Sequence, residues 1–583
     1  MKSITGKSRE RAPFEYRPPG ELVIVLAGEA GQGLLSIERI LVSVLRKDGF
    51  NVFAAKEYMS RVRGGVNSTE IRVAETPVRS YVERIDVLIP LCEGAIPHLA
   101  RRLSPDTVVL GDKAHLGYEG MVNIPFQEIA SELGNPLFAN TVAVGVLSGL
   151  LDVEAETLRA EVMAVFLSKG EEVAAKNVEA ARRGYDCGKE LRASGRVNAE
   201  IRKDPAVAGQ LLLNGAEAVA LGAIAGGCDA VFAYPMSPAT AVFTELAHYS
   251  KTTDIVVEQV EDEIGVMNMS LGAWYAGARS LVSTSGGGFA LMTEAVSLAG
   301  MIESPAVIHL SQRPGPATGL PTRTAQGDLN LALYAGHGYF PRIILAPGNT
   351  KQAFLLAQKA FNLADNFQVP VFILTDQSLM DSYYNIPEMK IDGLKIERHV
   401  VETTADYKRY AITNDGISPR GVPGHGAGRV AVDSDEHDEE GRITEDLDGV
   451  RTAMVEKRMR KAKAVRKAAL APDLIGPPRY KTLIVSWGSN YSAVAEAMDV
   501  VGDEALAFLH FTQVYPLHAS TASLLAAAKH VICVENNETG QFADLLKLET
   551  GIDIKDRILK CNGMPFSVEE MARNIKQMVK RDG

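Results

Sequence analysis

The sequence predicts an α/β protein of several domains, and three observations support this fold class. The chain of 583 residues is too long for one hydrophobic core and corresponds to roughly three to five domains. Short apolar runs alternate with helical stretches in three blocks, which is the pattern of mostly parallel sheets. This rhythm is lost between the second and third blocks. We therefore assign α/β domains to residues 21–195, 206–388 and 479–583, and an irregular connecting segment to residues 389–478.

The first block opens with an apolar strand, Glu21–Gly28, which leads through a glycine turn into a periodic helix at residues 34–49. A charged helical stretch at about residues 154–196 closes the block and leads into a linker. Further strands are expected near residues 51–55, 70–73, 87–91 and 107–110.

The glycine turn at residues 28–33 joins that strand to that helix, a position where backbone amides can bind a phosphate. Its spacing is not G-x-G-x-x-G, and no acidic ribose partner follows the next strand, so it argues only weakly for a nicotinamide. The alternative is a tight turn that packs helix on sheet. A cationic, glycine-rich segment, Tyr58–Gly65, favours an anionic ligand such as the phosphates of coenzyme A. The candidate contacts are Gly31, Gln32, Gly33, Ser60, Arg61 and Arg63.

The second block places polar motifs after its strands, where open α/β sheets bind ligands. Tyr234–Pro238 ends one strand, and its two prolines make a rigid turn that leaves the Ser237 hydroxyl free to donate. On this segment alone, a simple turn serine is an equal interpretation. Strands are expected at residues 230–234, 255–257, 279–284, 306–311, 342–346 and 369–375.

Four carboxylates cluster at the start of the helix that follows the second of these strands. Acidic side chains stabilise a helix N-terminus by ~0.3–1 kcal/mol each, so dipole complementation alone can explain them. The helix is rich in Gly, Ala, Ser and Met, so we expect it to be largely buried and to bury a carboxylate at its start, where proton transfer becomes possible. The four are Glu258, Glu261, Asp262 and Glu263.

Two glycine-rich segments follow later strands. Ser283–Phe289 carries three consecutive glycines that allow close approach of a ligand or another chain, although a tightly packed turn explains them equally well. Ser311–Thr322 is a long loop rich in proline and glycine. Its Arg313 has the guanidinium fork that binds a carboxylate, but alone it is equally a surface arginine.

The connecting segment is strongly charged. Residues 433–448 hold nine acidic residues, and residues 451–467 hold eight basic ones. We expect a solvated surface segment followed by an exposed helix. His437 within the acidic run suggests a metal site, but a solvated acidic loop is the favoured interpretation.

Composition narrows the function classes. The net charge of -11 argues against partners such as nucleic acid or an anionic membrane. Residues 1–20 contain no apolar core of a signal peptide, and the most apolar stretch, Gln210–Tyr234, contains charges and does not resemble a membrane span. We therefore expect a cytoplasmic protein. The five cysteines form no C-x-x-C pair or ferredoxin-type run, so we expect free, mostly buried thiols and no metal or cluster site in this chain.

Together these motifs resemble the α subunit of 2-oxoacid:ferredoxin oxidoreductases with a γ domain fused at the N-terminus, most closely those specific for 2-oxoglutarate. The resemblance covers nearly the whole chain. It implies a γ-type domain, then a transketolase-like domain that binds the pyrimidine ring of thiamine diphosphate, then a C-terminal transketolase-like domain. At residues 234–238 this chain has Met and Ser where the family has Ile and Thr. The segments that carry the resemblance are residues 28–33, 61–65, 234–238, 261–265, 284–289, 313–322, 407–410, 416–420 and 534–541.

The resemblance implies roles for individual residues. Glu263 falls on the glutamate that activates thiamine diphosphate through N1′ of its aminopyrimidine, and Ser237 and Arg313 are the expected partners of the substrate carboxylate. The implied reaction is decarboxylation of a 2-oxoacid, with single electrons passing to iron–sulfur clusters and the acyl group to coenzyme A. Further contacts are expected from Thr318 and Thr322 to substrate, and from Tyr234, Pro235, Gly287 and Phe289 to thiamine diphosphate.

Two motifs that this chemistry needs are missing from the sequence. There is no G-D-G followed by Asn, which binds the metal and diphosphate in thiamine enzymes, and no cluster motif. We therefore expect a β subunit to share the coenzyme, to carry Mg²⁺ and a [4Fe-4S] cluster, and to form an α2β2 assembly that reduces ferredoxin. Alternatives are an enzyme for pyruvate or branched-chain 2-oxoacids, a non-catalytic assembly subunit, and a nicotinamide dehydrogenase.

Overall fold

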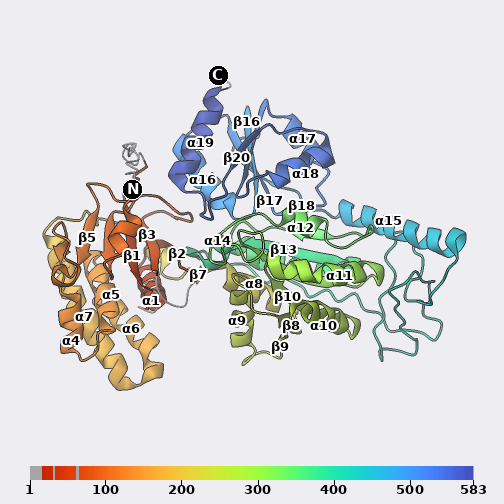
Figure 1. Ribbon diagram of the computed structural model, residues 1–583, viewed down its shortest axis with the longest axis horizontal. Helices are drawn as coiled ribbons and strands as arrows, with labels where there is room; N and C mark the ends of the chain where they lie inside the picture. Colours follow the sequence, from red (N-terminus) through yellow and green to blue (C-terminus); the bar gives the residue numbers. More distant parts are fainter. Residues whose placement is uncertain (1–15, 30–32, 61–64, 582–583) are drawn as a thin grey trace, which may run out of the picture. The chain divides into compact units, whose positions relative to one another are not determined.

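The computed structural model describes residues 16–29, 33–60 and 65–581 and divides into two compact units (Figure 1). The first unit holds residues 1–212, 383–387 and 567–573, and the second holds residues 213–382, 388–566 and 574–583. Among the described helices, none combines the length and apolar character that a membrane crossing requires. The five cysteines carry free thiols, and three of them are buried, in agreement with the prediction of free, mostly buried thiols.

The first unit is built on a sheet whose described strands run in the order β6-β5-β4-β1-β3-β2-β14-β7. β1 pairs in parallel with β4, and β4 with β5, whereas β3 lies antiparallel to both β1 and β2. The expectation of a mostly parallel sheet is therefore wrong on this side of β1, because β2 and β3 form an antiparallel pair. The strands are β1 (Glu21–Glu29), β2 (Asn51–Glu57), β3 (Val66–Ala74), β4 (Val87–Pro90), β5 (Val108–Gly111), β6 (Val122–Asn123), β7 (Leu211–Leu213) and β14 (Tyr383–Ile386).

Strand β14 reaches this sheet from much later in the chain and pairs antiparallel with β2. Asn385 holds it there through side-chain hydrogen bonds to Asn51 and Val52, and it also donates to Gln210 Oε1 (2.6 Å). Its amide nitrogen donates to Asn51 Oδ1 (3.0 Å), and its Oδ1 accepts from the Val52 amide (2.8 Å). The sequence assigned residues 383–387 to the second block, and the structure corrects this by placing them in the first unit.

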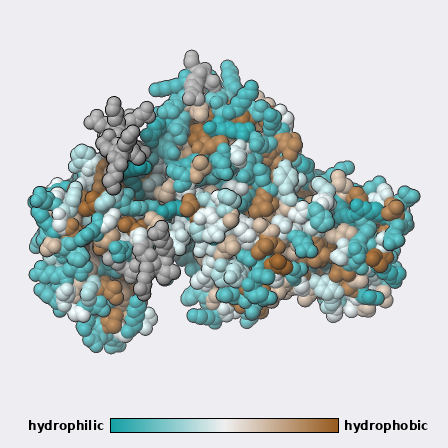
Figure 2. Space-filling model, in the orientation of Figure 1, coloured by the Kyte–Doolittle hydropathy of each residue, from teal (hydrophilic) through white to brown (hydrophobic). Residues whose placement is uncertain are grey.

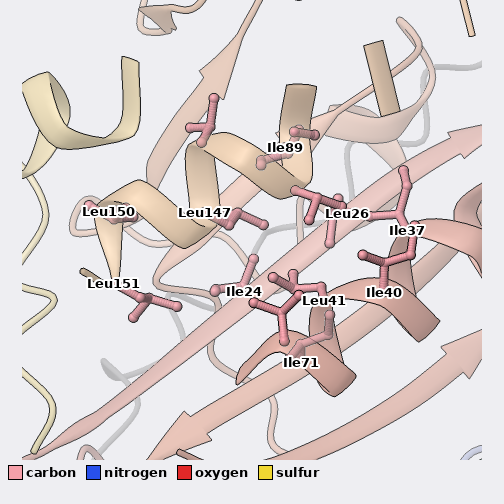
Figure 3. Packing of buried hydrophobic residues seen from close by; sticks show 14 of the residues in the cluster. Ile24, Leu26, Ile37, Ile40, Leu41, Ile71, Ile89, Leu147, Leu150 and Leu151 are labelled. Carbon is pink, nitrogen blue, oxygen red and sulfur yellow. The ribbon is translucent and has the colours of Figure 1, made fainter. Parts of the chain in front are cut away.

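The core of the first unit lies between β1 and the helices α1 and α5, where Ile24, Leu41 and Leu147 are fully buried (Figure 3). Helices α5 and α7 cross closely at glycines, because a Cβ on Gly145 would lie 2.1 Å from the Ala181 carbonyl oxygen. The helices are α1 (Leu34–Lys47), α2 (Ala95–Leu99), α3 (Lys113–Leu116), α4 (Phe126–Glu132), α5 (Phe138–Leu150), α6 (Ala155–Phe166), η1 (Leu167–Lys169), α7 (Glu171–Ala193) and η2 (Pro205–Val207).

The larger sheet of the second unit has the strand order β18-β12-β13-β11-β10-β8-β9 and is parallel except for β18. Successive residues such as Val307 and Ile308 belong to different core clusters, because side chains alternate between the faces of a strand. Helices α8, α9 and α13 contribute to one cluster, and α10, α11 and α12 to the other. The strands are β8 (Ala230–Ala233), β9 (Val256–Gln259), β10 (Ser280–Thr284), β11 (Ala306–Gln312), β12 (Ile343–Leu345), β13 (Pro370–Asp376) and β18 (Gln513–Tyr515). The helices are α8 (Gly215–Ala225), α9 (Thr240–Tyr249), α10 (Glu263–Tyr275), α11 (Gly286–Met301), α12 (Leu329–Leu333), α13 (Thr350–Phe367) and α14 (Gln377–Asp381).

The C-terminal block forms a smaller sheet in the order β15-β17-β16-β19-β20, which is parallel except for β15. This block also provides β18, which pairs antiparallel with β12 of the larger sheet. Its strands are β15 (Asp473–Ile475), β16 (Thr482–Trp487), β17 (Leu506–Phe511), β19 (His530–Glu535) and β20 (Asp556–Leu559). Its helices are α16 (Asn490–Val501), α17 (Thr521–Ala526) and α18 (Gln541–Thr550), and α19 (Val568–Arg581) is divided between the two units after residue 573.

The basic helix of the connecting segment is not simply exposed, contrary to expectation. It spans α15 (Thr452–Lys467) after the π-helical turn η3 (Leu447–Arg451). Lys457 and Lys461 on α15 are fully buried, and both form ion pairs with the buried carboxylate of Glu303. The expectation failed because a run of basic residues contains no information about an acidic partner more than 150 residues away.

The acidic run is also partly folded into the molecule. His437 has no exposed surface, and its ring centroid lies 3.9 Å from that of Tyr410. Burial lowers the pKa of His437. Glu436 forms ion pairs with Arg451 and Arg458. The interpretation of a solvated acidic loop is therefore wrong at these two positions, since charge pairing and ring stacking hold them against the protein.

Candidate active site

The predicted motifs of the second unit meet at one edge of its larger sheet. Strands β11, β10, β8 and β9 are neighbours in that order, and all four run parallel. Their carboxyl ends therefore lie along the same edge, where open α/β sheets bind ligands. The four motifs directly follow these strands. Strand order, which local pattern does not reveal, thus gathers segments that are up to about 80 residues apart.

Burial separates Glu263 from the other three acids at the start of α10. Asp262 is the N-cap, and its side chain accepts from the Gly265 amide (2.7 Å), whereas Glu258 and Glu261 are exposed. The Glu263 side chain is buried, and its Oε1 atom has no hydrogen-bond partner among the described residues. Capping of α10 explains Asp262, whereas Glu258 belongs to β9 and Glu261 precedes the cap. Neither capping nor the helix dipole explains why an oxygen of Glu263 is buried with no donor among the described residues.

Gly288 forms the surface against which the Glu263 carboxylate lies. A Cβ built on Gly288 would be 2.5 Å from Glu263 Oε1 and 2.5 Å from Thr284 Oγ1. Only glycine fits at this position without displacing one of those groups. The sequence singled out Gly287, which is exposed, and the structure shows that it is Gly288 that contacts Glu263.

Phe289 lies inside the domain, next to Gly288. Its side chain has no exposed surface and packs edge-to-face on Phe372, with ring centroids 5.4 Å apart. Its predicted contact with thiamine diphosphate remains an expectation.

Ser237 and Arg313 contact each other through the backbone carbonyl of Ser237, and their predicted binding of the substrate carboxylate remains an expectation. The Arg313 Nη1 atom donates to the carbonyl oxygen of Ser237 (2.8 Å). Burial lowers the pKa of Arg313, and its Nε atom has no partner among the described residues. Beside them the Gly288 amide donates to Met236 Sδ (3.3 Å), which joins the Tyr234–Pro238 turn to the start of α11.

The remaining predicted residues of this site occupy different environments. Tyr234 and Pro235 are exposed, and so is Thr318, whereas Thr322 is buried. Within the described residues, no hydrogen bond joins either threonine side chain to Ser237 or Arg313. Their predicted contacts with substrate remain expectations.

Sequence reasoning missed Asp328, which lies beside the same site. A Cβ on Gly286, the first residue of α11, would be only 2.4 Å from Asp328 Oδ2. Burial raises the pKa of Asp328 to about 6, and the nearby positive charge of Arg313 opposes this shift. A single acid before a short apolar helix gives only the signal of an N-cap, so nothing local indicated its position.

The C-terminal segment 534–541 anchors the loop that carries these residues. The Gln326 amide donates to the Asn536 carbonyl (2.6 Å), and Gln326 Oε1 accepts from Asn490 Nδ2 (2.7 Å). Glu535 accepts the free amides of Phe542 and Ala543 at the start of α18. These contacts give the segment a structural role in holding the loop in place.

The candidate coenzyme A site in the first unit is only partly described. Gly31, Gln32, Arg61 and Arg63 lie outside the described residues. Gly33 has a positive φ of 78° directly before α1, and a Cβ there would be 2.6 Å from Asn140 Nδ2. The local reason for this glycine is therefore packing as well as backbone conformation. Ser60 is exposed.

Comparison with known protein families shows to which class of protein this chain belongs. Residues 221–457 match the family model described as pyruvate flavodoxin/ferredoxin oxidoreductase, thiamine diP-binding, and residues 23–187 match the pyruvate ferredoxin/flavodoxin oxidoreductase model. The fold and the site thus define an α/β oxidoreductase component with a thiamine diphosphate-binding domain.

Relatives that match nearly the whole chain define the family within this class of protein. A 2-oxoacid:ferredoxin oxidoreductase subunit alpha from Sulfolobus sp is 31% identical, covering 95% of this chain and 96% of the relative. A 2-oxoglutarate oxidoreductase subunit of Mycobacterium tuberculosis is 27% identical, covering 98% and 94%. The solved 2-oxoglutarate:ferredoxin oxidoreductase from Magnetococcus marinus superimposes with a TM-score of 0.88 and 31% identity over 96% of this chain and 100% of its own. This chain belongs to the 2-oxoacid:ferredoxin oxidoreductase family, among its α subunits, and the predicted multidomain α/β fold class is confirmed.

Proposed function

We propose that this chain is the α subunit of a thiamine diphosphate-dependent 2-oxoglutarate:ferredoxin oxidoreductase. The reaction is the reversible oxidative decarboxylation of 2-oxoglutarate with coenzyme A to succinyl-CoA, CO2 and reduced ferredoxin. The observation that carries the proposal is the buried Glu263 oxygen, which faces Gly288 and has no donor in the part of the chain that the structure describes. The choice of 2-oxoglutarate is supported by the Magnetococcus marinus enzyme, whose structure contains 2-oxoglutarate, coenzyme A and succinyl-CoA.

The residues at the sheet edge fit an aminopyrimidine coenzyme. Glu263 Oε1 is a buried acceptor with no partner among the described residues, so a ring N–H can satisfy it. Gly288 adds no side chain beside that oxygen, so the carboxylate keeps its position at the start of α11. Thiamine diphosphate, when bound, supplies a nucleophilic carbon and an electron sink for decarboxylation. The contribution of Glu263 is to hold or accept a proton at its Oε1 atom.

Arg313 and Ser237 bind the substrate in this proposal. The guanidinium donates one N–H to the Ser237 carbonyl, which fixes its plane and leaves its other donors for a carboxylate. The Ser237 hydroxyl lies on the same turn and donates to the same anion. Thr318 and Thr322 belong to the loop that closes over this end of the substrate. Coenzyme A binds through the glycine turn and the 58–65 segment of the first unit.

A β subunit completes the site, because this chain lacks the motif for Mg²⁺ and diphosphate as well as a cluster motif. The partner carries Mg²⁺ and a [4Fe-4S] cluster, passes electrons to ferredoxin, and assembles with this chain as α2β2 in the cytoplasm. Exposed apolar side chains beside Glu263 support such docking: Ile264 on α10 and Leu291 on α11 border a groove of about 590 Å³. Apolar surface is visible over these two helices (Figure 2).

Turnover by the co-purified complex tests the proposal. We expect ferredoxin reduction that requires both thiamine diphosphate and coenzyme A and that is fastest with 2-oxoglutarate. Faster turnover of pyruvate or 2-oxoisovalerate would reassign the substrate and keep the chemistry. A complex that decarboxylates none of the three would support the alternative of a non-catalytic assembly subunit.

Gly288→Ala should lower kcat of this complex by at least ~10²-fold. The added methyl would overlap Glu263 Oε1 and Thr284 Oγ1, and misplacement of a reacting group by about 1 Å costs on the order of 10²-fold. The matched control is Gly272→Ala on α10, where a Cβ meets nothing within 4 Å. Steady-state kinetics give kcat for both variants. Equal kcat values would show that catalysis does not require the close approach of Gly288 to Glu263.

A further inference from the structure

The loop after β11 closes on itself and brings Asp328 back to Arg313. The Asp328 amide donates to Gln312 Oε1 (3.0 Å), and Gln312 directly precedes Arg313 in the chain. The Gln312 Nε2 atom donates to the Thr375 carbonyl (3.0 Å), which ties this junction to β13. Backbone and amide contacts therefore set the position of Asp328, and its carboxylate is not needed to hold the loop.

The carboxylate of Asp328 is placed against the start of α11 without a compensating contact. Its Oδ2 atom is buried and has no hydrogen-bond partner among the described residues. It lies so close to Gly286 that any side chain there would collide with it. The positive charge of Arg313 attracts the Asp328 carboxylate, but the Arg313 guanidinium donates its hydrogen bond to the Ser237 carbonyl. A buried carboxylate in this position is costly when ionised.

Two buried hydroxyl groups flank the residues that Asp328 contacts. Ser285, which precedes Gly286, and Ser311, which precedes Gln312, are both fully buried with hydroxyl oxygens that have no partner among the described residues. Glu263 lies against Gly288 on the same helix end, but Arg313 is the charged group that acts on Asp328. The electrostatic interaction at the start of α11 that acts on Asp328 is therefore the one with Arg313.

We propose that Asp328 is a positioning residue that competes with the substrate carboxylate for the positive charge of Arg313, so that binding of the anionic substrate is coupled to proton uptake by Asp328. This inference rests on the proposed function of Arg313. A second anion beside Asp328 disfavours its ionised form, and protonation removes the repulsion. With a pKa of about 6, Asp328 is mostly ionised in the free enzyme at neutral pH, so substrate binding draws a proton from solvent.

The proposal predicts the pH dependence of KM. For the complete αβ complex, KM for 2-oxoglutarate should rise by ~10-fold between pH 6.5 and 8.0, within the limit of about tenfold per pH unit that one proton allows. In Asp328→Asn we expect KM to stay constant over this pH range. At pH 8 the KM of the variant should be lower than that of the wild type, and its kcat should change by less than about threefold. Glutarate lacks the reacting oxo group. Its inhibition constant should rise with pH in the wild type and stay constant in Asp328→Asn, as KM does.

A matched control is Asp254→Asn, which removes an exposed carboxylate from the same domain and should retain the wild-type profile. An Asp328→Asn enzyme whose KM and glutarate inhibition keep the wild-type pH dependence would overturn the proposal. If Asp328→Asn does not assemble, Asp328→Ser, which also lacks the charge, is measured in the same way. A complex that turns over no 2-oxoacid would refute the proposed function, whereas normal turnover with unchanged profiles would refute only this inference.

Discussion

Glu263→Gln should lower kcat of the assembled enzyme by ~10²–10⁴-fold, the contribution that a positioned acid–base group makes to catalysis. Glutamine has the same shape and still fits over Gly288, so packing at the start of α10 is retained. It cannot hold or release a proton at the buried oxygen. We therefore expect a large fall in kcat, a small change in KM, and a melting temperature close to that of the wild type.

The control for this experiment is Glu258→Gln, which removes an exposed acid close to the same helix and should change kcat by less than about twofold. Steady-state turnover at saturating thiamine diphosphate, together with thermal unfolding of each complex, gives both quantities. Undiminished activity of Glu263→Gln would contradict the catalytic assignment, whatever the stability of the variant.

Glu303→Gln should destabilise the chain by about 3–5 kcal/mol, a large part of a typical free energy of unfolding. Glu303, Lys457 and Lys461 are all at most 2% exposed. The two ammonium groups hold the pKa of Glu303 below its ordinary value, so the carboxylate remains ionised inside the protein. Its replacement leaves two buried lysines without a counter-charge, and their desolvation is then uncompensated.

A surface pair provides the comparison for Glu303. Glu439 forms an ion pair with Lys408 (3.1 Å), and both side chains are partly exposed, so Glu439→Gln should cost at most about 1 kcal/mol. Denaturant unfolding measures both variants. Adding Lys457→Met and Lys461→Met to Glu303→Gln should recover part of the loss, because the two uncompensated lysine charges are then removed. Equal effects of Glu303→Gln and Glu439→Gln would show that the buried network contributes no more than a surface pair.

Much of the larger sheet could be predicted from local sequence. β11 was expected at residues 306–311 and spans Ala306–Gln312, because a parallel strand that is buried on both faces is a continuous apolar run. The place of β14 could not be predicted, since its partner β2 lies more than 300 residues earlier. The buried lysines of α15 were missed for the same reason, because the partner that changes their environment is distant in sequence.

The candidate site, like the fold, could be predicted only in part from local sequence. Four acids at the start of α10 have the same local pattern, and only the packing of the folded chain distinguishes the buried, unpaired oxygen of Glu263. The pairing of Ser237 with Arg313 followed from family resemblance, but the use of the Ser237 carbonyl depends on backbone geometry. Asp328 was missed because its position depends on how a long loop returns to the strand from which it started.

The position of β14 has a consequence for how this polypeptide can be divided. A gene split near residue 212 would yield a first product without β14, which the second product would carry within its own sequence. That first product would expose the edge of β2 and would need the missing strand in trans, as in donor-strand complementation. The N-terminal unit expressed alone should therefore be more stable to thermal unfolding when residues 383–387 are grafted onto it or supplied as a peptide.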